Sequence, residues 1–199
     1  MRQIGERMTD TRQAVYRIGV VADTHIPDRA GALHPALLST LAEARVDLIC
    51  HCGDICIPSV LADLEKVAPV EAVRGNRDVL FRKTLPLVRM LTIHGVKIVL
   101  THGHFGWKQY WRDKLQHLTV GYRLERYQRF METHWPDADV YLFGHTHHAE
   151  IVRYNTHLIL NPGSASVPPR AHPQTTIGLI EIGVDRTVGG KIVVLKGAV

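Results

Sequence analysis

The fold class is decided by one stretch, Tyr16-Arg17-Ile18-Gly19-Val20-Val21-Ala22-Asp23-Thr24-His25. Its first seven residues form a nearly continuous apolar run, which is typical of a β-strand covered on both faces. The run ends at Asp23 and His25, whose i, i+2 spacing points both side chains to the same side of an extended chain. The stretch therefore predicts a buried strand that carries an acid and an imidazole at its C-terminal end.

Two similar strands follow, each reached through an amphipathic segment with apolar residues at helical spacing. These strands close at Gly53-Asp54 and at Gly75-Asn76, so each again ends in a polar side chain. Alternating strands and helices predict an α/β fold, in which ligands bind beyond the carboxyl ends of the strands. The expected helices span 33–45 and 59–67, and the expected strands span 47–52 and 70–73.

Beyond Asn76 the pattern changes to strands joined mainly by hairpins. Residues 105–135 interrupt this pattern and predict a helical hairpin insertion that breaks near 119–121. We see no domain boundary and expect residues 1–199 to form a single domain, with 1–13 a candidate for disorder. The remaining strands are expected at 87–94, 96–100, 140–143, 150–154, 158–160, 176–182 and 191–195.

Composition describes an ordinary globular chain, with 45% hydrophobic and 22% charged residues. The net charge of +5 is a modest excess that does not by itself indicate nucleic-acid binding. Three clustered cysteines, Cys50, Cys52 and Cys56, argue against a disulfide framework and favour reduced thiols. No segment resembles a signal peptide or reaches the roughly 18 apolar residues of a membrane span, so we expect a cytoplasmic protein.

Polar residues at strand-to-loop junctions form the candidate metal centre. Their mixture of nitrogen and oxygen ligands suits Mn²⁺, Fe²⁺, Ni²⁺ or Zn²⁺, while four imidazoles disfavour Ca²⁺ and Mg²⁺. Seven ligands exceed one tetrahedral site and suit two ions that share a bridging carboxylate. The candidate ligands are Asp23, His25, Asp54, Asn76, His102, His145 and His147.

The ordered motifs D-x-H, G-D, G-N, G-H and G-H-x-H resemble the calcineurin-like metallophosphoesterase superfamily. Asn161-Pro162-Gly163-Ser164 and the later Pro169-Arg170 look like its small bacterial and archaeal phosphodiesterase branch. The resemblance runs from Ile18 to about Leu195. It implies a four-layer α/β/β/α sandwich, with two mostly mixed β-sheets face to face and helices outside.

The resemblance also implies a division of the ligands between two ions. One ion would take Asp23, His25 and His147, and the second would take Asn76, His102 and His145, with Asp54 bridging them. We expect Mn²⁺ at both positions, with Ni²⁺, Fe²⁺ or Zn²⁺ as alternatives. A metal-bridging hydroxide would then attack the phosphorus atom of the substrate in line with the leaving group.

One position departs from the family pattern. Many members read G-N-H-[DE], and the histidine helps to protonate the leaving group, whereas this chain has Arg77 after Asn76. Arginine cannot donate a proton near neutral pH because its pKa lies above about 12. Arg77 would therefore either hold a phosphate oxygen or form a surface salt bridge with Asp78. His104 becomes the candidate general acid, beside Asn76 and Arg77 as the other candidate catalytic residues.

Three further residues have simpler interpretations. We expect His51 to be a packed core histidine, because it lies on a buried strand. Asn161 and Ser164 are expected to shape the turn in which they lie.

The insertion at 105–135 is rich in aromatic and basic residues. Between positions 107 and 130 there are six Lys or Arg residues and two acidic residues, Asp113 and Glu125, which gives a net charge of +4. We expect its first turn, 105–110, to cap the site and the remainder to pack on the body or on a second subunit. The residues concerned are Trp107, Tyr110, Trp111, Tyr122, Tyr127, Phe130 and Trp135, with Lys108, Arg112, Lys114, Arg123, Arg126 and Arg129.

These features favour a two-metal phosphodiesterase acting on small organic phosphodiesters, with nucleotides among the candidates. A phosphomonoesterase or phosphoprotein phosphatase on the same site is one alternative. A non-catalytic scaffold is another, since a eukaryotic retromer subunit of this superfamily serves as a binding module. We expect no membrane partner and no sequence-specific nucleic-acid partner, because no DNA-reading motif is present. Homo-oligomerisation stays open.

Overall fold

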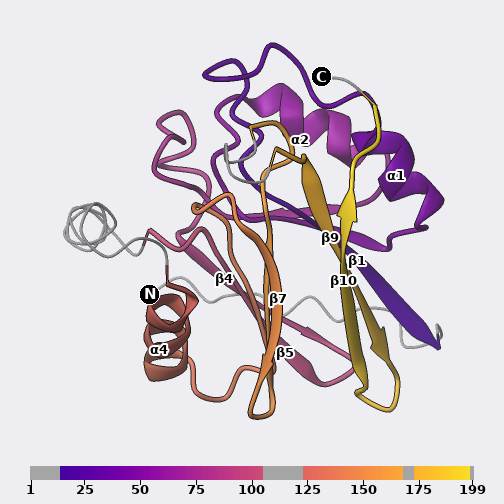
Figure 1. The fold of residues 1–199 in the computed structure, drawn as a ribbon, viewed down its shortest axis with the longest axis vertical. Helices are drawn as coiled ribbons and strands as arrows, with labels where there is room; N and C mark the ends of the chain where they lie inside the picture. Colours follow the sequence, from indigo (N-terminus) through magenta and orange to yellow (C-terminus); the bar gives the residue numbers. More distant parts are fainter. Residues whose placement is uncertain (1–13, 105–122, 168–172, 198–199) are drawn as a thin grey trace.

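Two β-sheets lie face to face in the computed structural model, which describes residues 14–104, 123–167 and 173–197 (Figure 1). The first sheet has the spatial order β10 (Val188–Val194), β9 (Thr176–Gly183), β1 (Val15–Val21), β2 (Leu48–His51) and β3 (Val70–Ala72). The second has the order β4 (Val88–Ile93), β5 (Val96–Thr101), β6 (Val140–Leu142), β8 (His157–Pro162) and β7 (Ala149–Tyr154). The described helices are α1 (Leu37–Glu43), α2 (Pro58–Glu65) and α4 (Leu124–His134).

Each sheet is mixed, as the sequence predicts. Strands β1, β2 and β3 run parallel and are linked through α1 and α2, whereas β9 and β10 complete the sheet in antiparallel pairs. In the second sheet β5, β6 and β8 are parallel, and β4 and β7 are antiparallel edge strands. Strands β1, β2, β3, β5 and β6 end in the loops that carry the candidate ligands.

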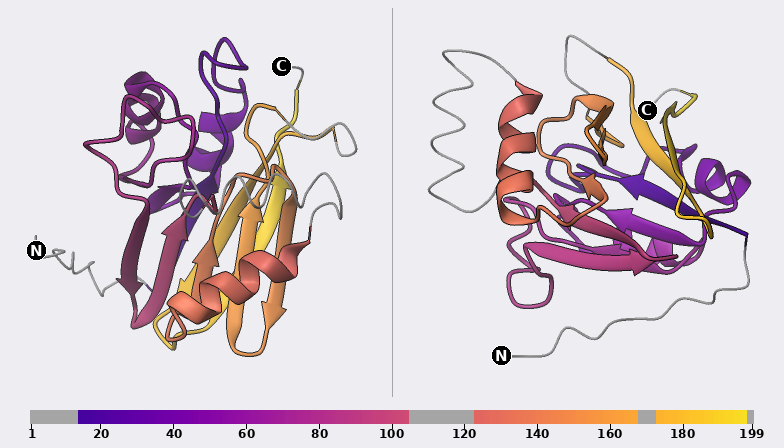
Figure 2. Two further views of the ribbon diagram at one scale, coloured as in Figure 1. Left: turned by 90° about the vertical axis from the view of Figure 1, so that its left-hand side faces the viewer. Right: turned by 90° about the horizontal axis from the view of Figure 1, so that it is seen from below.

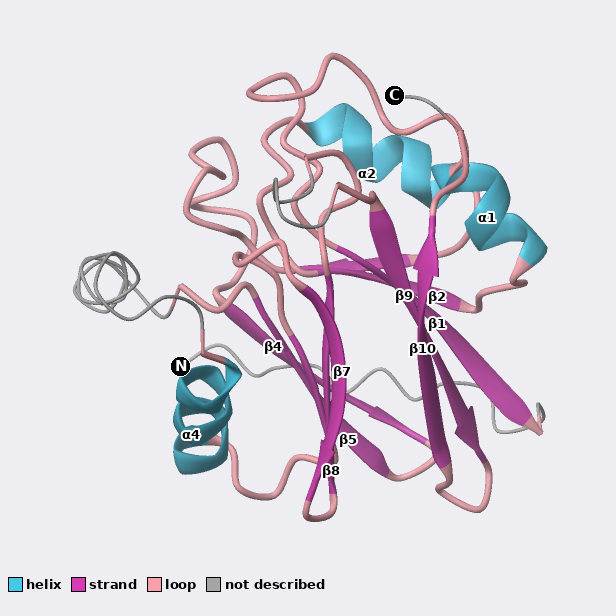
Figure 3. Ribbon diagram, in the orientation of Figure 1, coloured by secondary structure: helices cyan, strands magenta, loops and turns pink. Residues whose placement is uncertain are grey.

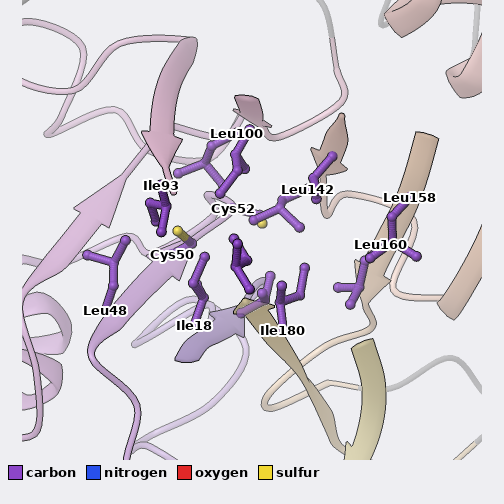
Figure 4. Close-up of a cluster of buried hydrophobic side chains, with 14 of the residues drawn as sticks. Ile18, Leu48, Cys50, Cys52, Ile93, Leu100, Leu142, Leu158, Leu160 and Ile180 are labelled. Atoms are coloured by element: carbon purple, nitrogen blue, oxygen red, sulfur yellow. The ribbon is translucent and has the colours of Figure 1, made fainter. Parts of the chain in front are cut away.

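Three apolar clusters separate four layers of structure. The central cluster lies between the sheets and includes Ile18, Cys50, Leu100 and Leu160 (Figure 4). A second cluster joins the first sheet to α1 and α2, and a third joins the second sheet to α4. Figure 3 shows α1 and α2 together on one side and α4 on the opposite side, and Figure 2 shows α4 lying across the strands of the second sheet. The predicted α/β/β/α sandwich is confirmed.

Several local predictions need adjustment. Helix α1 begins at Leu37 and not near residue 33, because Pro35 and the ring of His34, which accepts the N–H of Ala36, shape a turn before it. The second helix of the insertion is present as α4, whereas residues 105–122 and 1–13 lie outside the described residues. No helix in the described part of the chain has the length and apolar character that a membrane span needs.

Candidate metal centre

Three candidate ligands from two different sheets meet around one carboxylate oxygen. His25 follows β1, and His147 lies in the loop after β6; their Nε2 atoms are 3.1 Å apart. Oδ1 of Asp23 lies 3.6 Å from Nε2 of His25 and 3.4 Å from Nε2 of His147. Two ring nitrogens and one carboxylate oxygen therefore point toward a common position, which is the arrangement that a metal ion requires.

A second group lies on the other side of Asp54. Nε2 of His102 is 3.1 Å from Oδ1 of Asn76 and 3.5 Å from Oδ1 of Asp54. The rings of His102 and His145 are 5.0 Å apart. The other oxygen of Asp54, Oδ2, lies 3.7 Å from Nε2 of His25 in the first group. Each oxygen of this one carboxylate therefore faces a different cluster of nitrogen ligands.

The backbone is strained where these side chains are presented. Five of the seven candidate ligands have positive φ angles, in the left-handed region that non-glycine residues rarely adopt. Such conformations cost free energy and persist where the surroundings hold them, often at functional sites. The angles are 54° at Asp23, 49° at His25, 56° at Asp54, 71° at His145 and 59° at His147.

The two buried carboxylates of the centre, Asp23 and Asp54, stay ionised and therefore favour positive charge beside them. Burial alone would raise the pKa of Asp23, but the imidazoles of His147 and His25 beside its carboxylate hold that pKa far below the ordinary value. Burial likewise opposes the charged form of His102, yet the carboxylate of Asp54 raises the pKa of that imidazole to about 9. The pKa of Asp54 falls to about 2, because the charge and hydrogen bond of His102 outweigh burial. Two buried carboxylates that stay ionised are suited to holding divalent cations.

The residues also fit metal ions in their hydrogen bonding. Oδ1 of Asp23 is buried and has no hydrogen-bond partner among the described residues, although three imidazoles surround its carboxylate. Nδ1 of His102 bonds the carbonyl oxygen of Cys52 at 2.8 Å, and Nδ1 of His147 bonds that of Val167 at 2.5 Å. A carbonyl oxygen only accepts, so each Nδ1 donates a proton to it, and each Nε2, once deprotonated, would be the lone-pair donor toward the centre.

Comparison with known proteins places the chain in a family. Residues 16–185 match the family model described as the calcineurin-like phosphoesterase superfamily domain. The chain belongs to this superfamily. Membership implies divalent metal ions, which agrees with the grouped histidines and aspartates.

Individual relatives of this superfamily member include both named phosphoesterases and a sorting protein. A probable metallophosphoesterase of Methanothermobacter thermautotrophicus is 36% identical over 161 residues, covering 80% of this chain and 83% of the relative. Vacuolar protein sorting-associated protein 29 of Schizosaccharomyces pombe is 30% identical over 151 residues, covering 75% and 72%. The solved structure of Vps29 from Cryptosporidium parvum has a TM-score of 0.66 at 21% identity, covers 93% of this chain and 100% of that chain, and shows the shared fold.

The buried carboxylate of Asp78 holds the loops that carry two residues of the second group. It is 1% exposed and accepts four backbone N–H groups. Two of these, from Asp54 and Gly75, reach Oδ2 at 2.9 and 2.6 Å. The other two, from Ile55 and Cys56, reach Oδ1 at 2.8 and 2.7 Å. One buried acid thus ties together the loops that carry Asp54 and Asn76.

Of the two alternatives for Arg77, the surface salt bridge with Asp78 is wrong. Asp78 turns inward to the backbone groups of the Asp54 loop, whereas the guanidinium of Arg77 lies 2.9 Å from Oδ2 of Asp28. The backbone N–H of Arg77 donates to Oδ1 of Asp54 at 2.8 Å. The backbone of Arg77 therefore contacts the metal centre, while its guanidinium forms an ion pair at the partly exposed edge of the site.

A clamp of residues 161–167 supports the first group. Ser164 and Ser166 donate their hydroxyls to the carbonyl oxygen of Asp23 at 2.9 and 3.0 Å, and Ser166 also lies 2.7 Å from that of Thr24. Asn161 donates its amide to the carbonyl oxygen of Gly144 at 3.0 Å. Asn161 and Ser164 do shape the local turn, but they also hold two ligand loops. Ser166 was not among the predicted site residues; its only signal in the sequence is a small polar residue close to a Pro-Gly turn.

His51 is buried, as predicted, yet it also joins two loops of the site. Its Nδ1 accepts the N–H of Gly53 at 3.1 Å, so its Nε2 carries the proton and faces the hydroxyl of Thr24 at 3.2 Å. Burial lowers the pKa of His51 to about 3. Its neutral ring therefore links the Asp23 loop to the Asp54 loop.

His104 lies beside the second group. It is 8% exposed, and its ring is 5.4 Å from that of His102 and 6.4 Å from that of His145. Burial, followed by the charge on His102, lowers the pKa of His104 to about 4. The ring is close enough to serve the site but is neutral near pH 7.

Proposed function

We propose that this chain is a metal-dependent phosphodiesterase that hydrolyses small organic phosphodiesters, nucleotides among them. The observation that carries the proposal is the position of Asp54, whose two oxygens face two separate clusters of nitrogen ligands. A carboxylate shared in this way is typical of paired metal ions that act together on a phosphate ester. Free cysteines in the core between the sheets support activity in a reducing compartment such as the cytoplasm.

The two groups support a division of the ligands. Asp23, His25 and His147 would hold one ion and Asn76, His102 and His145 the other, and Asp54 would serve both. The mixed nitrogen and oxygen donors are compatible with Mn²⁺, our first choice, and with Ni²⁺, Fe²⁺ or Zn²⁺. When bound, two such ions supply an activated water and neutralise charge that develops on the phosphoryl oxygens.

The chain's own residues prepare this chemistry. The carbonyl oxygens of Cys52 and Val167 fix the rings of His102 and His147, so that neither ring must reorient during the reaction. Asp78 and the 161–167 clamp hold the loops in their strained conformations. Arg77 contributes hydrogen-bond donors for a phosphoryl oxygen. The nearby His104 is the candidate proton donor, through the small fraction of its rings that is protonated near pH 7.

Preference for diesters rests on the residues around the leaving group. Arg77 replaces the histidine that many family members place after the asparagine, and arginine cannot protonate a leaving group. His104 is mainly neutral near pH 7, since its pKa is lowered to about 4. Strong acid assistance is therefore limited, which favours diesters and other esters with good leaving groups.

A direct assay decides between the substrate classes. A bis-aryl phosphate diester and the matching aryl phosphate monoester would be supplied to the protein with Mn²⁺, Ni²⁺ or Zn²⁺ in separate reactions. We expect kcat/KM for the diester to exceed that for the monoester with at least one ion. A clear excess for the monoester would establish the alternative, a phosphomonoesterase on the same site.

A non-catalytic scaffold is the second candidate, favoured by the 30% identity to a vacuolar sorting protein. It predicts no turnover of either ester with any of the three ions. Asp54→Asn and Asp63→Asn provide a matched pair of controls, because both replace one carboxylate by an amide. Asp63 lies on α2 and pairs with Lys66, so only the Asp54 variant should lose turnover.

A further inference from the structure

The carboxylate of Asp28 faces both the metal centre and Arg77. Its Oδ2 lies 2.9 Å from one terminal nitrogen of Arg77, and its Oδ1 lies 3.2 Å from the same nitrogen. On its other side, Oδ2 is 3.8 Å from Nδ1 of His25, which is buried and has no hydrogen-bond partner among the described residues. Asp28 is therefore the direct link between a candidate ligand and the arginine at the edge of the site.

Arg77 lies where it could contact a substrate, independently of its pairing with Asp28. Its backbone N–H is bonded to Asp54, so the residue is anchored at the carboxylate that faces both ligand groups. Its side chain is 41% exposed and that of Asp28 is 34% exposed, so the ion pair borders solvent. A guanidinium has five N–H donors, and the pair with Asp28 leaves several of them free to bond a phosphoryl oxygen.

The charge of the pair determines what it attracts. A phosphodiester carries one negative charge, whereas a monoester carries about 1.5 to 2 near neutral pH, because its second ionisation falls near pH 6. A free guanidinium would favour the more highly charged monoester. Oδ2 of Asp28 also lies 4.0 Å from Nε of Arg29, so the acid faces two arginines and is much closer to Arg77. Paired with Asp28 at 2.9 Å, the guanidinium of Arg77 still offers directed hydrogen bonds while the acid offsets its charge.

From this geometry we propose that Asp28 is a specificity-determining residue, which positions Arg77 and neutralises it so that the site does not favour phosphate dianions. The proposal rests on the proposed phosphoesterase function and deepens it. Through its pairing with Asp28, Arg77, which follows Asn76 in the chain, would serve in substrate discrimination and not in proton donation.

Two variants of this pair should change specificity in opposite directions. Asp28→Asn leaves Arg77 unpaired and adds one positive charge, so the ratio of diester to monoester kcat/KM should fall by about three- to tenfold. The change should appear mainly in KM for the monoester. Arg77→Gln leaves Asp28 unpaired and adds one negative charge, so the same ratio should rise. Asp63→Asn is the control for a lost surface ion pair and should leave the ratio unchanged.

Calorimetric titration with inorganic phosphate gives a readout that does not depend on turnover. The metal-loaded Asp28→Asn protein should bind phosphate more tightly than the unaltered protein, by a similar factor, and Arg77→Gln should bind it more weakly. Unchanged phosphate affinity in both variants, or shifts in the same direction, would overturn the proposal. Both titrations use excess metal ion, so that weaker metal binding in Asp28→Asn does not mask its change in phosphate affinity.

The outcome is separable from that of the proposed function. A wild-type preference for monoesters would defeat the proposed diester activity, but the opposite shifts in the two variants would still support Asp28 as a specificity residue. Normal diester turnover with no shift in either variant would defeat the role of Asp28 and leave the phosphodiesterase proposal standing.

Discussion

Asp54 and Asp78 hold each other's loops in place. Oδ2 of Asp78 accepts the backbone N–H of Asp54 at 2.9 Å, while Oδ1 of Asp54 accepts the N–H of Arg77, the residue that precedes Asp78, at 2.8 Å. The loops after β2 and β3 are thus cross-linked by two buried carboxylates. This relationship keeps Asp54 in its strained conformation, at φ 56°, between the two groups of nitrogen ligands.

Replacing Asp78 should therefore loosen the loops after β2 and β3. In Asp78→Asn an amide group takes the place of one acceptor oxygen and faces backbone N–H groups that it cannot satisfy. We expect the free energy of unfolding to fall by about 2–4 kcal/mol, since buried hydrogen bonds to a charged acceptor are lost. Chemical denaturation of the metal-free protein measures this, with exposed Asp63→Asn as the control. A change as small as that of the control would show that Asp78 is not a structural support.

The central position of Asp54 leads to a prediction about metal content. Asp54→Ala removes the carboxylate that faces both groups, so we expect loss of both ions and of phosphoesterase activity. Metal analysis after dialysis, together with the diester assay, measures the two effects. His147→Ala is the comparison, because its Nε2 faces only the first group, and it should retain the ion held by His102. Full metal occupancy in Asp54→Ala would contradict the shared-carboxylate assignment.

His104 should affect the leaving group and not the metal ions. Its ring lies next to the second group but is not needed to complete it, so His104→Ala should keep both ions. The rate should fall mainly for substrates with poor leaving groups, because these need a proton most. A series of aryl diesters with increasing leaving-group pKa tests this. An equal rate loss across the series would remove His104 as the general acid.

The clamp at 161–167 should be needed for the first group in particular. Ser166→Ala removes hydrogen bonds to the carbonyl oxygens of Asp23 and Thr24, so we expect a loss of about 1–3 kcal/mol in stability. Binding of the ion assigned to Asp23 should weaken more than binding of the other. Calorimetric metal titration resolves the two affinities. Ser39→Ala on α1 is the control, since its hydroxyl makes a single exposed bond and should matter little.

His51 gives a prediction about pH. Its pKa is lowered from an ordinary 6.5 to about 3, so the unfolded chain binds a proton in this range that the folded protein excludes. The contribution of His51 is complete above about pH 6.5 and is lost as the pH falls toward 3. Protonation of Nδ1 would also break its bond with Gly53.

The non-titrating variant His51→Gln isolates this contribution. In the metal-free protein, the stability advantage of wild type over the variant should shrink as the pH falls from about 6.5 to 4. Denaturant midpoints at several pH values in this range measure the difference. A constant difference would show that His51 does not exclude a proton when folded.

Much of the fold could be predicted from the sequence because hydrophobic periodicity depends on residues that are close together in the chain. The apolar run at 16–22 became β1, and the alternation of strands and helices correctly predicted the parallel half of the first sheet. The seven strand-end residues were also recognisable, since each follows an apolar strand and carries a ligand atom. Their assignment to particular ions stays a prediction for metal analysis to test.

Partners across the fold were harder to predict because they depend on side-chain direction. One of the two alternatives for Arg77 was a salt bridge with its neighbour Asp78, yet it pairs with Asp28, which is 49 positions away. Asp78 instead points inward, where four N–H groups of two loops need an acceptor. Nothing in the spacing of these residues distinguishes the two arrangements.

The strands, their order along the chain and the chemical types of the candidate ligands could thus be predicted from the sequence, because hydrophobic periodicity and motif order are encoded locally. Which of these groups meet became visible in the folded chain. The two oxygens of Asp54 face different clusters, Asp28 pairs with Arg77, and residues 161–167 hold loops from both sheets. These contacts join segments far apart in the chain, and their geometry is set when two twisted sheets pack face to face.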